Sequence, residues 1–192
     1  MKKILILQGH PDAESYCRSL SKAYKDGALE SGATVDEIVI SDLQFNPNLT
    51  FGYRKRTDLE TDLVLAWEKI KTADHLVIVY PLWWGGMPAL MKGFFDRLFL
   101  PGFAFQKREN SLLWDKLLKG KSARIITTMD QPTWYFWLVY WAPAHRALKN
   151  TILEFCGIKP VSITSIGPIR LSTEEFRKSK LEKIRKLGIQ LK

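Results

Sequence analysis

Apolar residues fall into short runs and helical stripes that alternate along the chain. The first run, KILILQ at residues 3–8, is nearly continuous, as expected of a central strand in a parallel sheet. Residues 14–31 then repeat apolar positions at helical spacing, and Gly32 ends that predicted helix. An alternating pattern at residues 35–40 predicts a second strand.

The same order of strand and helix continues to residue 187. Residues 43–57 are expected to be irregular, because they contain the turn signal Asn-Pro-Asn. The remaining predicted elements are helices at 58–72, 88–100, 142–156 and 173–187, strands at 75–80, 123–128 and 161–166, and a long connection at 101–121. Five strands alternating with five helices predict an α/β fold, a single domain over residues 1–192 with one doubly wound parallel sheet. The common order 2-1-3-4-5 puts a ligand crevice between strands one and three.

The exit from the third predicted strand is the most unusual segment of the chain. The apolar run passes into PLWWGG at residues 81–86 before Pro88 opens the next helix. Ligands of open α/β sheets lie just past the carboxyl ends of the strands. Two adjacent indoles and two glycines at that position let the backbone approach a flat ligand closely. The segment therefore predicts a site for a planar aromatic cofactor.

The loop after the first strand, residues 9–17, is a candidate phosphate site. It enters a helix, whose N-terminal backbone N–H groups and dipole favour an anion. Ser15 adds a hydroxyl, and His10 adds an imidazole that can donate to a phosphate oxygen. The plainer interpretation is that Ser15 only caps the helix, and the charges of Asp12 and Glu14 oppose an anion. The chain has neither a G-x-G-x-x-G fingerprint nor a P-loop.

The connection after the fourth strand carries a dense aromatic segment. A polar, Pro-containing turn at residues 129–133 leads into WYFWLVYW at residues 134–141, with six aromatic residues in eight. The segment has no clean helical or alternating period. Three interpretations stay open: a dimer interface that also forms a lid, a substrate wall, or ordinary core.

The charge and the cysteine content limit the kinds of ligand and site that this chain can have. The net charge is +9, but the positive residues are scattered and are densest in the last helix, where acidic residues interleave. A solvated helical face is the plainer interpretation, and attraction of anionic ligands or of a membrane surface is the alternative. Cys17 and Cys156 cannot build a disulfide framework, and they lack metal-ligand spacing. With neither metal nor nucleophile motifs, a bound cofactor is the best carrier of chemistry.

Two histidines and the N-terminus complete the list of candidates. His75 opens a strand and is expected to be structural. His145, near the start of the fourth helix, could reach the carboxyl edge of the sheet, although a surface position is the plainer expectation. The sequence shows no export signal and no apolar run long enough to span a membrane, so we expect a soluble cytoplasmic protein.

Several of these segments together resemble one family. His10 followed by Ser15, YPLWWGGMPALMKGFFDRLFLPGFAF at residues 80–105, the TT pair at 127–128 and LEFCGI at 153–158 are similar to NAD(P)H:quinone oxidoreductases of the flavodoxin-like fold. The resemblance covers nearly the whole chain and implies a three-layer sandwich. It also implies a flavin, FMN or FAD, that takes hydride from NAD(P)H and passes two electrons to a quinone or related acceptor. A homodimer is implied as well.

The resemblance assigns roles to particular residues. Tyr135 is the implied catalytic residue, which helps to bind the hydride donor or acceptor. The implied flavin-binding residues come from three loops: His10, Ser15, Tyr16 and Cys17; Pro81, Leu82, Trp83, Trp84 and Gly85; and Thr127, Thr128, Met129 and Asp130. The chain departs from many members at Cys17, where they have asparagine, and at Met129-Asp130, where they have Gly-Gly. No histidine matches the one that pairs with the tyrosine in the mammalian-type enzymes.

Three other functions stay open from the sequence. An electron-carrier flavodoxin usually has a strongly acidic surface, which this chain lacks. A regulatory flavoprotein subunit, similar to the ancillary proteins of potassium-efflux systems, is compatible with the basic surface and would associate with a membrane transporter. A nucleic-acid-binding module lacks support, because basic and aromatic residues do not interleave.

Overall fold

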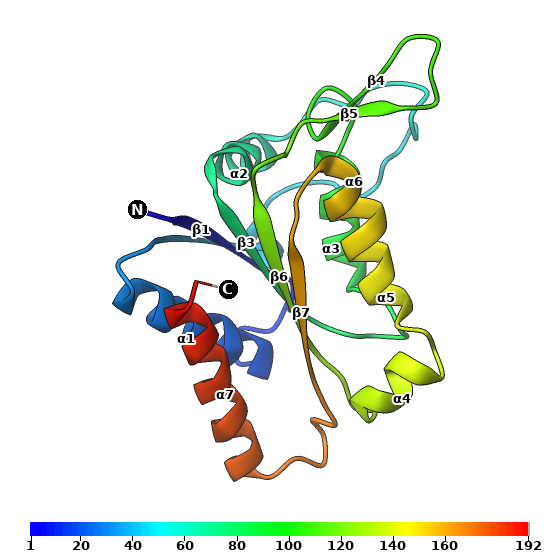
Figure 1. Ribbon diagram of the computed structural model, residues 1–192. Coiled ribbons are helices and arrows are strands. Elements are labelled where there is room, and N and C mark those ends of the chain that lie inside the picture. Colours follow the sequence, from blue (N-terminus) through cyan, green and yellow to red (C-terminus); the bar gives the residue numbers. More distant parts are fainter. Residues whose placement is uncertain (192) are drawn as a thin grey trace.

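The computed structural model describes residues 1–191 and contains the predicted parallel sheet (Figure 1). The strands of this sheet are β1 (Lys3–Gln8), β2 (Thr34–Val39), β3 (His75–Pro81), β6 (Ser122–Thr128) and β7 (Val161–Ile166). Their order, β2-β1-β3-β6-β7, is the predicted 2-1-3-4-5, which confirms the predicted fold class. Every neighbouring pair is parallel, so the carboxyl ends of all five strands lie at one edge of the sheet.

Helices cover both faces of the sheet and complete three layers (Figure 1). On one face lie α1 (Tyr16–Glu30) and α7 (Glu174–Ile189). The other face carries α2 (Thr61–Thr72), α3 (Ala89–Leu98) and a continuous segment formed by α5 (Pro143–Arg146), the π-helix η2 (Ala147–Leu153) and α6 (Glu154–Cys156). A short 3₁₀ turn, η1 (Ile40–Asp42), follows β2. Within residues 1–191, no helix combines the length and apolarity that crossing a membrane requires.

Two segments differ from the sequence-based expectation. The connection at 101–121 contains an antiparallel hairpin of β4 (Phe105–Lys107) and β5 (Trp114–Lys116), whose strands are too short to show an alternating pattern. The aromatic segment, expected to have no regular period, begins as the helix α4 (Thr133–Leu138). Six residues are less than two helical turns, so no period could be read from the sequence.

Several predicted element boundaries also move by a few residues, and two of these shifts have a clear local description. The helix expected to start at Ala142 starts at Pro143, because Ala142 has a left-handed φ of 47° that a helix cannot include. The strand expected to reach Ile40 ends at Val39, where the chain turns into η1.

Both His75 and His145 are buried in the fold. Nδ1 of His75 lies 2.7 Å from the hydroxyl oxygen of Ser122, in agreement with the expected structural role. The prediction that His145 lies at the surface is wrong. This residue is buried, because α5 places its ring against the ring of Phe136 in α4. Desolvation lowers the pKa of each imidazole to about 4.

These buried histidines predict acid lability. In the unfolded chain a histidine has a pKa of about 6.5. As the pH falls, the histidine is therefore protonated in the unfolded state before it is protonated in the folded state. Stability from the buried neutral rings is therefore complete above that pH and is lost between about pH 6.5 and 4. At pH 5 we expect the free energy of unfolding to be about 2 kcal/mol lower, for each of the two histidines, than it is at neutral pH.

Urea unfolding at pH 7.5 and pH 5 measures this loss. The variant His75→Asn should lose about 2 kcal/mol less than the wild type between the two pH values. An equal loss in both proteins would show that His75 does not titrate as the buried geometry requires.

Candidate active site

Two adjoining cavities lie at the carboxyl edge of the sheet, where the loops after β1, β3 and β6 meet. The larger has a volume of about 710 Å³ and the smaller about 280 Å³. Both are bounded by Leu82, Met129 and Asp130, which places them side by side. Together they occupy the position predicted for the ligand, beside the switch point between β1 and β3.

The exit from β3 forms the floor of the larger cavity. The backbone N–H of Leu82 donates to the carbonyl oxygen of Thr128 at 2.8 Å, which ties this loop to β6. Trp83 and Gly86 then exchange two backbone hydrogen bonds of 3.0 and 2.9 Å around a two-residue turn. Both central residues of that turn have left-handed φ values, 51° at Trp84 and 74° at Gly85, the geometry of a type I′ turn.

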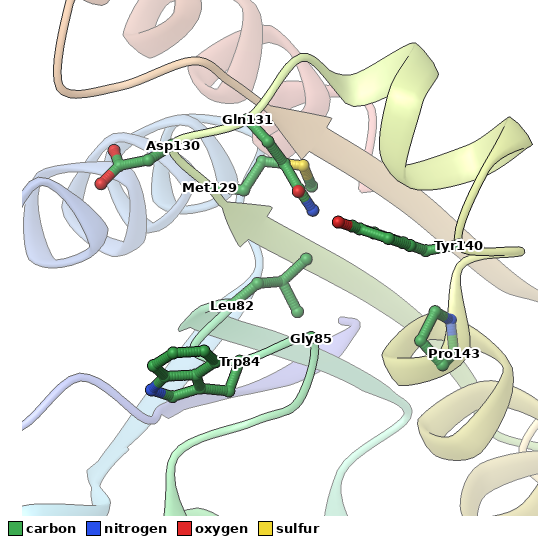
Figure 2. Close-up of a pocket in the computed structure, with 8 residues that line it drawn as sticks. All are labelled: Leu82, Trp84, Gly85, Met129, Asp130, Gln131, Tyr140 and Pro143. Atoms are coloured by element: carbon green, nitrogen blue, oxygen red, sulfur yellow. The ribbon is translucent and has the colours of Figure 1, made fainter.

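Neither indole fills the hollow. Trp84 is fully exposed at the margin of the larger cavity, where Figure 2 shows its ring beside Leu82. Trp83 packs edge-on against the imidazole of His10, with 5.5 Å between ring centroids. The space between the loops therefore stays open to a flat ligand, as the sequence predicts.

The turn stores strain that a substitution can release. A left-handed conformation costs an L-residue about 1–2 kcal/mol, and asparagine tolerates it far better than tryptophan. Because Trp84 is fully exposed, Trp84→Asn should raise the free energy of unfolding by about 1 kcal/mol, measured by urea denaturation of flavin-free protein. The matched control is Leu112→Asn, equally exposed without a positive φ, which should change little. A destabilised Trp84→Asn would mean that the indole packs on the protein in solution.

The smaller cavity has the features of a phosphate site. Ser15 caps α1, its hydroxyl oxygen accepting from the backbone N–H of Arg18 at 3.4 Å, and it also lines the cavity. Capping and phosphate binding are therefore compatible here. Burial lowers the pKa of His10, and its Nδ1 accepts from the N–H of Asp12 at 3.0 Å. The neutral ring must then carry its proton on Nε2, which is left as a donor.

Two further predicted residues line the smaller cavity with their hydroxyl and thiol groups protonated. The hydroxyl of Tyr16 donates to the carbonyl oxygen of Arg177 at 2.8 Å, and burial raises its pKa to about 12. Burial also raises the pKa of Cys17 to about 12, and its Sγ lies 3.2 Å from the hydroxyl oxygen of Thr128. Neither group acts as an anion at neutral pH, so neither repels a phosphate.

The acidic residues of the site are engaged by backbone groups. Oδ1 of Asp12 accepts from the N–H of Glu14 at 2.9 Å, and Oδ1 of Asp130 accepts from the N–H of Arg170 at 3.0 Å. Figure 2 shows the Asp130 carboxylate pointing away from Tyr140. No lysine or arginine of the described residues lines either cavity, so an anion there would be held by neutral donors. Residues 1–191 contain no cluster of ligands suited to a metal ion.

The aromatic segment contributes one wall, through a residue that the sequence analysis did not select. Tyr140 lines the larger cavity, and Figure 2 shows its hydroxyl facing the side chain of Gln131. The predicted catalytic residue, Tyr135, lines neither cavity and instead packs edge-on against Tyr140, with ring centroids 5.1 Å apart. The electrostatic interaction with Tyr135, followed by hydrogen bonding with it, raises the pKa of Tyr140.

The rest of the segment divides between core and surface. Phe136 is fully buried, and α5 brings His145 against its ring, with centroids 5.0 Å apart. Nε2 of His145 lies 2.7 Å from the hydroxyl oxygen of Ser165 and 3.4 Å from that of Thr127, so Thr127 points into this layer and lines neither cavity. Five large apolar side chains of the segment remain exposed: Trp134, Trp137, Leu138, Val139 and Trp141.

Comparison with known proteins identifies the fold family. Residues 2–187 match the family of proteins with the flavodoxin-like fold. The chain belongs to this flavodoxin-like family. It is 29% identical over 182 residues to an uncharacterized NAD(P)H oxidoreductase of Haemophilus influenzae, covering 93% of this chain and 90% of the relative. It is 28% identical over 207 residues to the mouse ribosyldihydronicotinamide dehydrogenase [quinone], covering 92% and 86%.

A solved structure of a quinone oxidoreductase agrees over the whole fold. The NAD(P)H:quinone oxidoreductase of Methanothermobacter marburgensis superimposes with a TM-score of 0.84 and 25% identity, covering 99% of this chain and 96% of that one. The resemblance expected from the sequence is therefore confirmed. Most of the predicted flavin-binding residues lie around the two cavities, and their individual roles remain predictions.

Three residues of the larger cavity were missed: Gln131, Tyr140 and Pro143. Tyr140 is one of six aromatic residues in this segment, and the sequence does not distinguish the residue that faces the cavity from the others. The left-handed φ values of Trp141 and Ala142 reverse the chain just after it. The only signal in the sequence is its position shortly before the proline that starts a helix.

Proposed function

We propose that this protein is a flavin-dependent NAD(P)H:quinone oxidoreductase. The observation that carries the proposal is the pairing of two cavities at the carboxyl edge: one is wide and apolar with an exposed backbone floor, and the other is small and placed at the N-terminus of α1. This pairing suits a molecule with a planar ring system and a phosphate. The naming of the relatives as NAD(P)H and quinone oxidoreductases supports the same activity.

The residues present fit a flavin. The backbone of Leu82 and Gly85 would lie along the ring system, since Gly85 has no side chain to keep a ring away. Ser15, the Nε2 donor of His10 and the N-terminus of α1 would hold the phosphate of FMN or the first phosphate of FAD. Thr128 and Cys17 close the end of the smaller cavity. Bound flavin would supply the redox chemistry, accepting hydride from NAD(P)H and returning two electrons to a quinone.

The larger cavity would then hold the nicotinamide and the quinone in turn. Met129 and Leu82 present apolar side chains that exclude water, while Tyr140 offers a hydroxyl from the opposite wall. A protonated tyrosine can donate a hydrogen bond to a carbonyl oxygen that gains negative charge as it is reduced. Tyr135 supports this role by packing against Tyr140.

We further propose that two chains associate through the exposed aromatic face of α4 and the segment after it. Trp134, Trp137 and Leu138 form an apolar surface next to the larger cavity, and such surfaces usually mark an interaction site. Sedimentation velocity should therefore find a dimer. The double variant Trp134→Ser/Leu138→Ser should shift it toward the monomer.

Flavin extraction tests the cofactor directly. Protein purified or incubated with a mixture of FMN and FAD should retain one flavin per chain, which chromatography identifies after denaturation. The variant Ser15→Asp, which keeps a capping oxygen but places a negative charge in the smaller cavity, should lose it. A protein that retains no flavin under any of these conditions would contradict the proposal. Activity with NAD(P)H and a quinone, without any partner protein, separates an enzyme from an electron carrier.

A further inference from the structure

The larger cavity of the proposed active site has two polar side chains that face each other. Figure 2 shows the amide end of Gln131 directed at the hydroxyl of Tyr140 across the cavity. The indole nitrogen of Trp84 and the carboxylate of Asp130 both point away from Tyr140 in the same view. The other lining side chains described are apolar. A ligand in the cavity therefore meets hydrogen-bonding side chains mainly at this pair.

The backbone that carries Gln131 is held in place by the exit from β7. The N–H of Met129 donates to the carbonyl oxygen of Ile166, and its carbonyl oxygen accepts from the N–H of Ile169, both at 3.0 Å. Gly167 packs so closely that a Cβ there would lie 2.8 Å from the carbonyl oxygens of Met129 and Gln131. The loop after β6 is thus fixed, and a fixed loop loses little freedom when its side chain binds a ligand.

The amide of Gln131 is available for a ligand. It takes part in none of the side-chain hydrogen bonds formed within residues 1–191. A primary amide has two N–H donors and one carbonyl acceptor, so the group that complements it best is a second primary amide. The hydroxyl of Tyr140 differs, because it already forms a hydrogen bond with Tyr135.

The two substrates that would use this cavity differ in the same chemical respect. The nicotinamide ring of NAD(P)H carries a primary carboxamide, which both donates and accepts, whereas the carbonyl oxygens of a quinone only accept. No lysine or arginine of the described residues lines either cavity, so the phosphates of NAD(P)H would gain no ion pair there. The nicotinamide end is therefore the part of NAD(P)H that this cavity can recognise.

We propose that Gln131 is the residue that selects the hydride donor, by pairing its side-chain amide with the carboxamide of the nicotinamide. Each amide would donate one N–H to the carbonyl oxygen of the other. The Tyr140 hydroxyl would serve the quinone, whose carbonyl oxygen needs only a donor. This inference rests on the proposed function and names the residue that separates its two substrates.

Anaerobic stopped-flow measurement of the two half-reactions tests the inference. In flavin-loaded protein, Gln131→Leu should raise the Kd for NAD(P)H at least about tenfold, because the carboxamide loses both of its partners. Reoxidation of the reduced protein by a quinone should change less than about twofold. The matched control is Gln190→Leu, exposed at the end of α7, which should leave both half-reactions within about twofold of the wild type.

A binding measurement without turnover accompanies the kinetics. The tetrahydro forms of NADH and NADPH keep the carboxamide but cannot give up hydride, and isothermal titration calorimetry should show the same loss of affinity for them in Gln131→Leu. The acetylpyridine analogue of the dinucleotide accepts a hydrogen bond at its acetyl group but does not donate one. It should bind the wild type more weakly than the nicotinamide form, and Gln131→Leu should not distinguish the two.

Three other results would overturn this inference. Unchanged affinity for the nicotinamide in Gln131→Leu would show that the amide does not contact it. An equal loss in both half-reactions, or a loss of bound flavin, would assign Gln131 to the flavin or to the packing of its loop. Each of these results leaves the oxidoreductase itself intact. A wild-type protein whose flavin neither nicotinamide reduces would instead contradict the proposed function, and this inference with it.

Discussion

The variant Gly188→Ala is expected to lower the free energy of unfolding by about 3 kcal/mol, the upper end of the cost of overpacking. Gly188 lies where α7 crosses α1, and a Cβ there would clash with the carbonyl oxygen of Tyr24 and come within 3.0 Å of the backbone nitrogen of Ala28. Gly27 faces the same crossing from α1, where a Cβ would clash with the carbonyl of Arg185. Because these contacts are with backbone, no side-chain rotation can relieve them.

The sign of this effect distinguishes packing from helix propensity. In an exposed helix, glycine to alanine stabilises by about 0.8–1 kcal/mol, so propensity alone predicts a gain. The control Ser179→Ala, at an exposed position of α7, should show a small gain. Thermal unfolding should find Gly188→Ala lower by about 6–12 °C. A melting temperature at or above the wild-type value would show that α1 and α7 are farther apart than described.

The second large effect is expected at the wall of the larger cavity. Tyr140→Phe removes only the hydroxyl that faces the cavity, so kcat/KM for quinone reduction should fall by about 10–100-fold. Flavin content should not change, because in the proposed arrangement the loops after β1 and β3 hold the phosphate and the ring system. The pKa of Tyr140 is raised by Tyr135, so its hydroxyl stays protonated as a donor through neutral pH.

Two companion variants make the result specific. Tyr53→Phe, at the opposite end of the molecule, should leave kcat/KM unchanged. Tyr135→Phe should have a smaller effect than Tyr140→Phe, since Tyr135 does not line the cavity. If Tyr135→Phe causes the larger loss, the catalytic role predicted from the sequence belongs to Tyr135 itself, and Tyr140 only supports it.

The sheet, its order and two of the three site loops could be predicted from the sequence because their signals are local. A buried parallel strand is a continuous apolar run, and the loops at residues 9–17 and 81–86 follow directly from two such runs. The order 2-1-3-4-5 then followed from general rules for α/β proteins. These features depend on neighbours in the sequence.

The third loop could not be predicted, because its residues are sorted by tertiary packing. Phe136, Tyr140 and Trp141 look alike in the sequence, yet Phe136 is core, Tyr140 is half-exposed and lines the cavity, and Trp141 is exposed outside it. What separates them is the short helix α4 and the left-handed turn after it. The burial of His145 likewise depends on α5 passing beneath α4, a contact that no local pattern encodes.

Rapid mixing under anaerobic conditions tests the central claim most directly. Flavin-loaded protein mixed with NAD(P)H should lose the visible absorption band of oxidised flavin, and a second mixing with a quinone should restore it with no other protein present. Bleaching that a quinone cannot reverse, or no bleaching by either nicotinamide, would contradict the assignment of the carboxyl-edge cavities to this reaction.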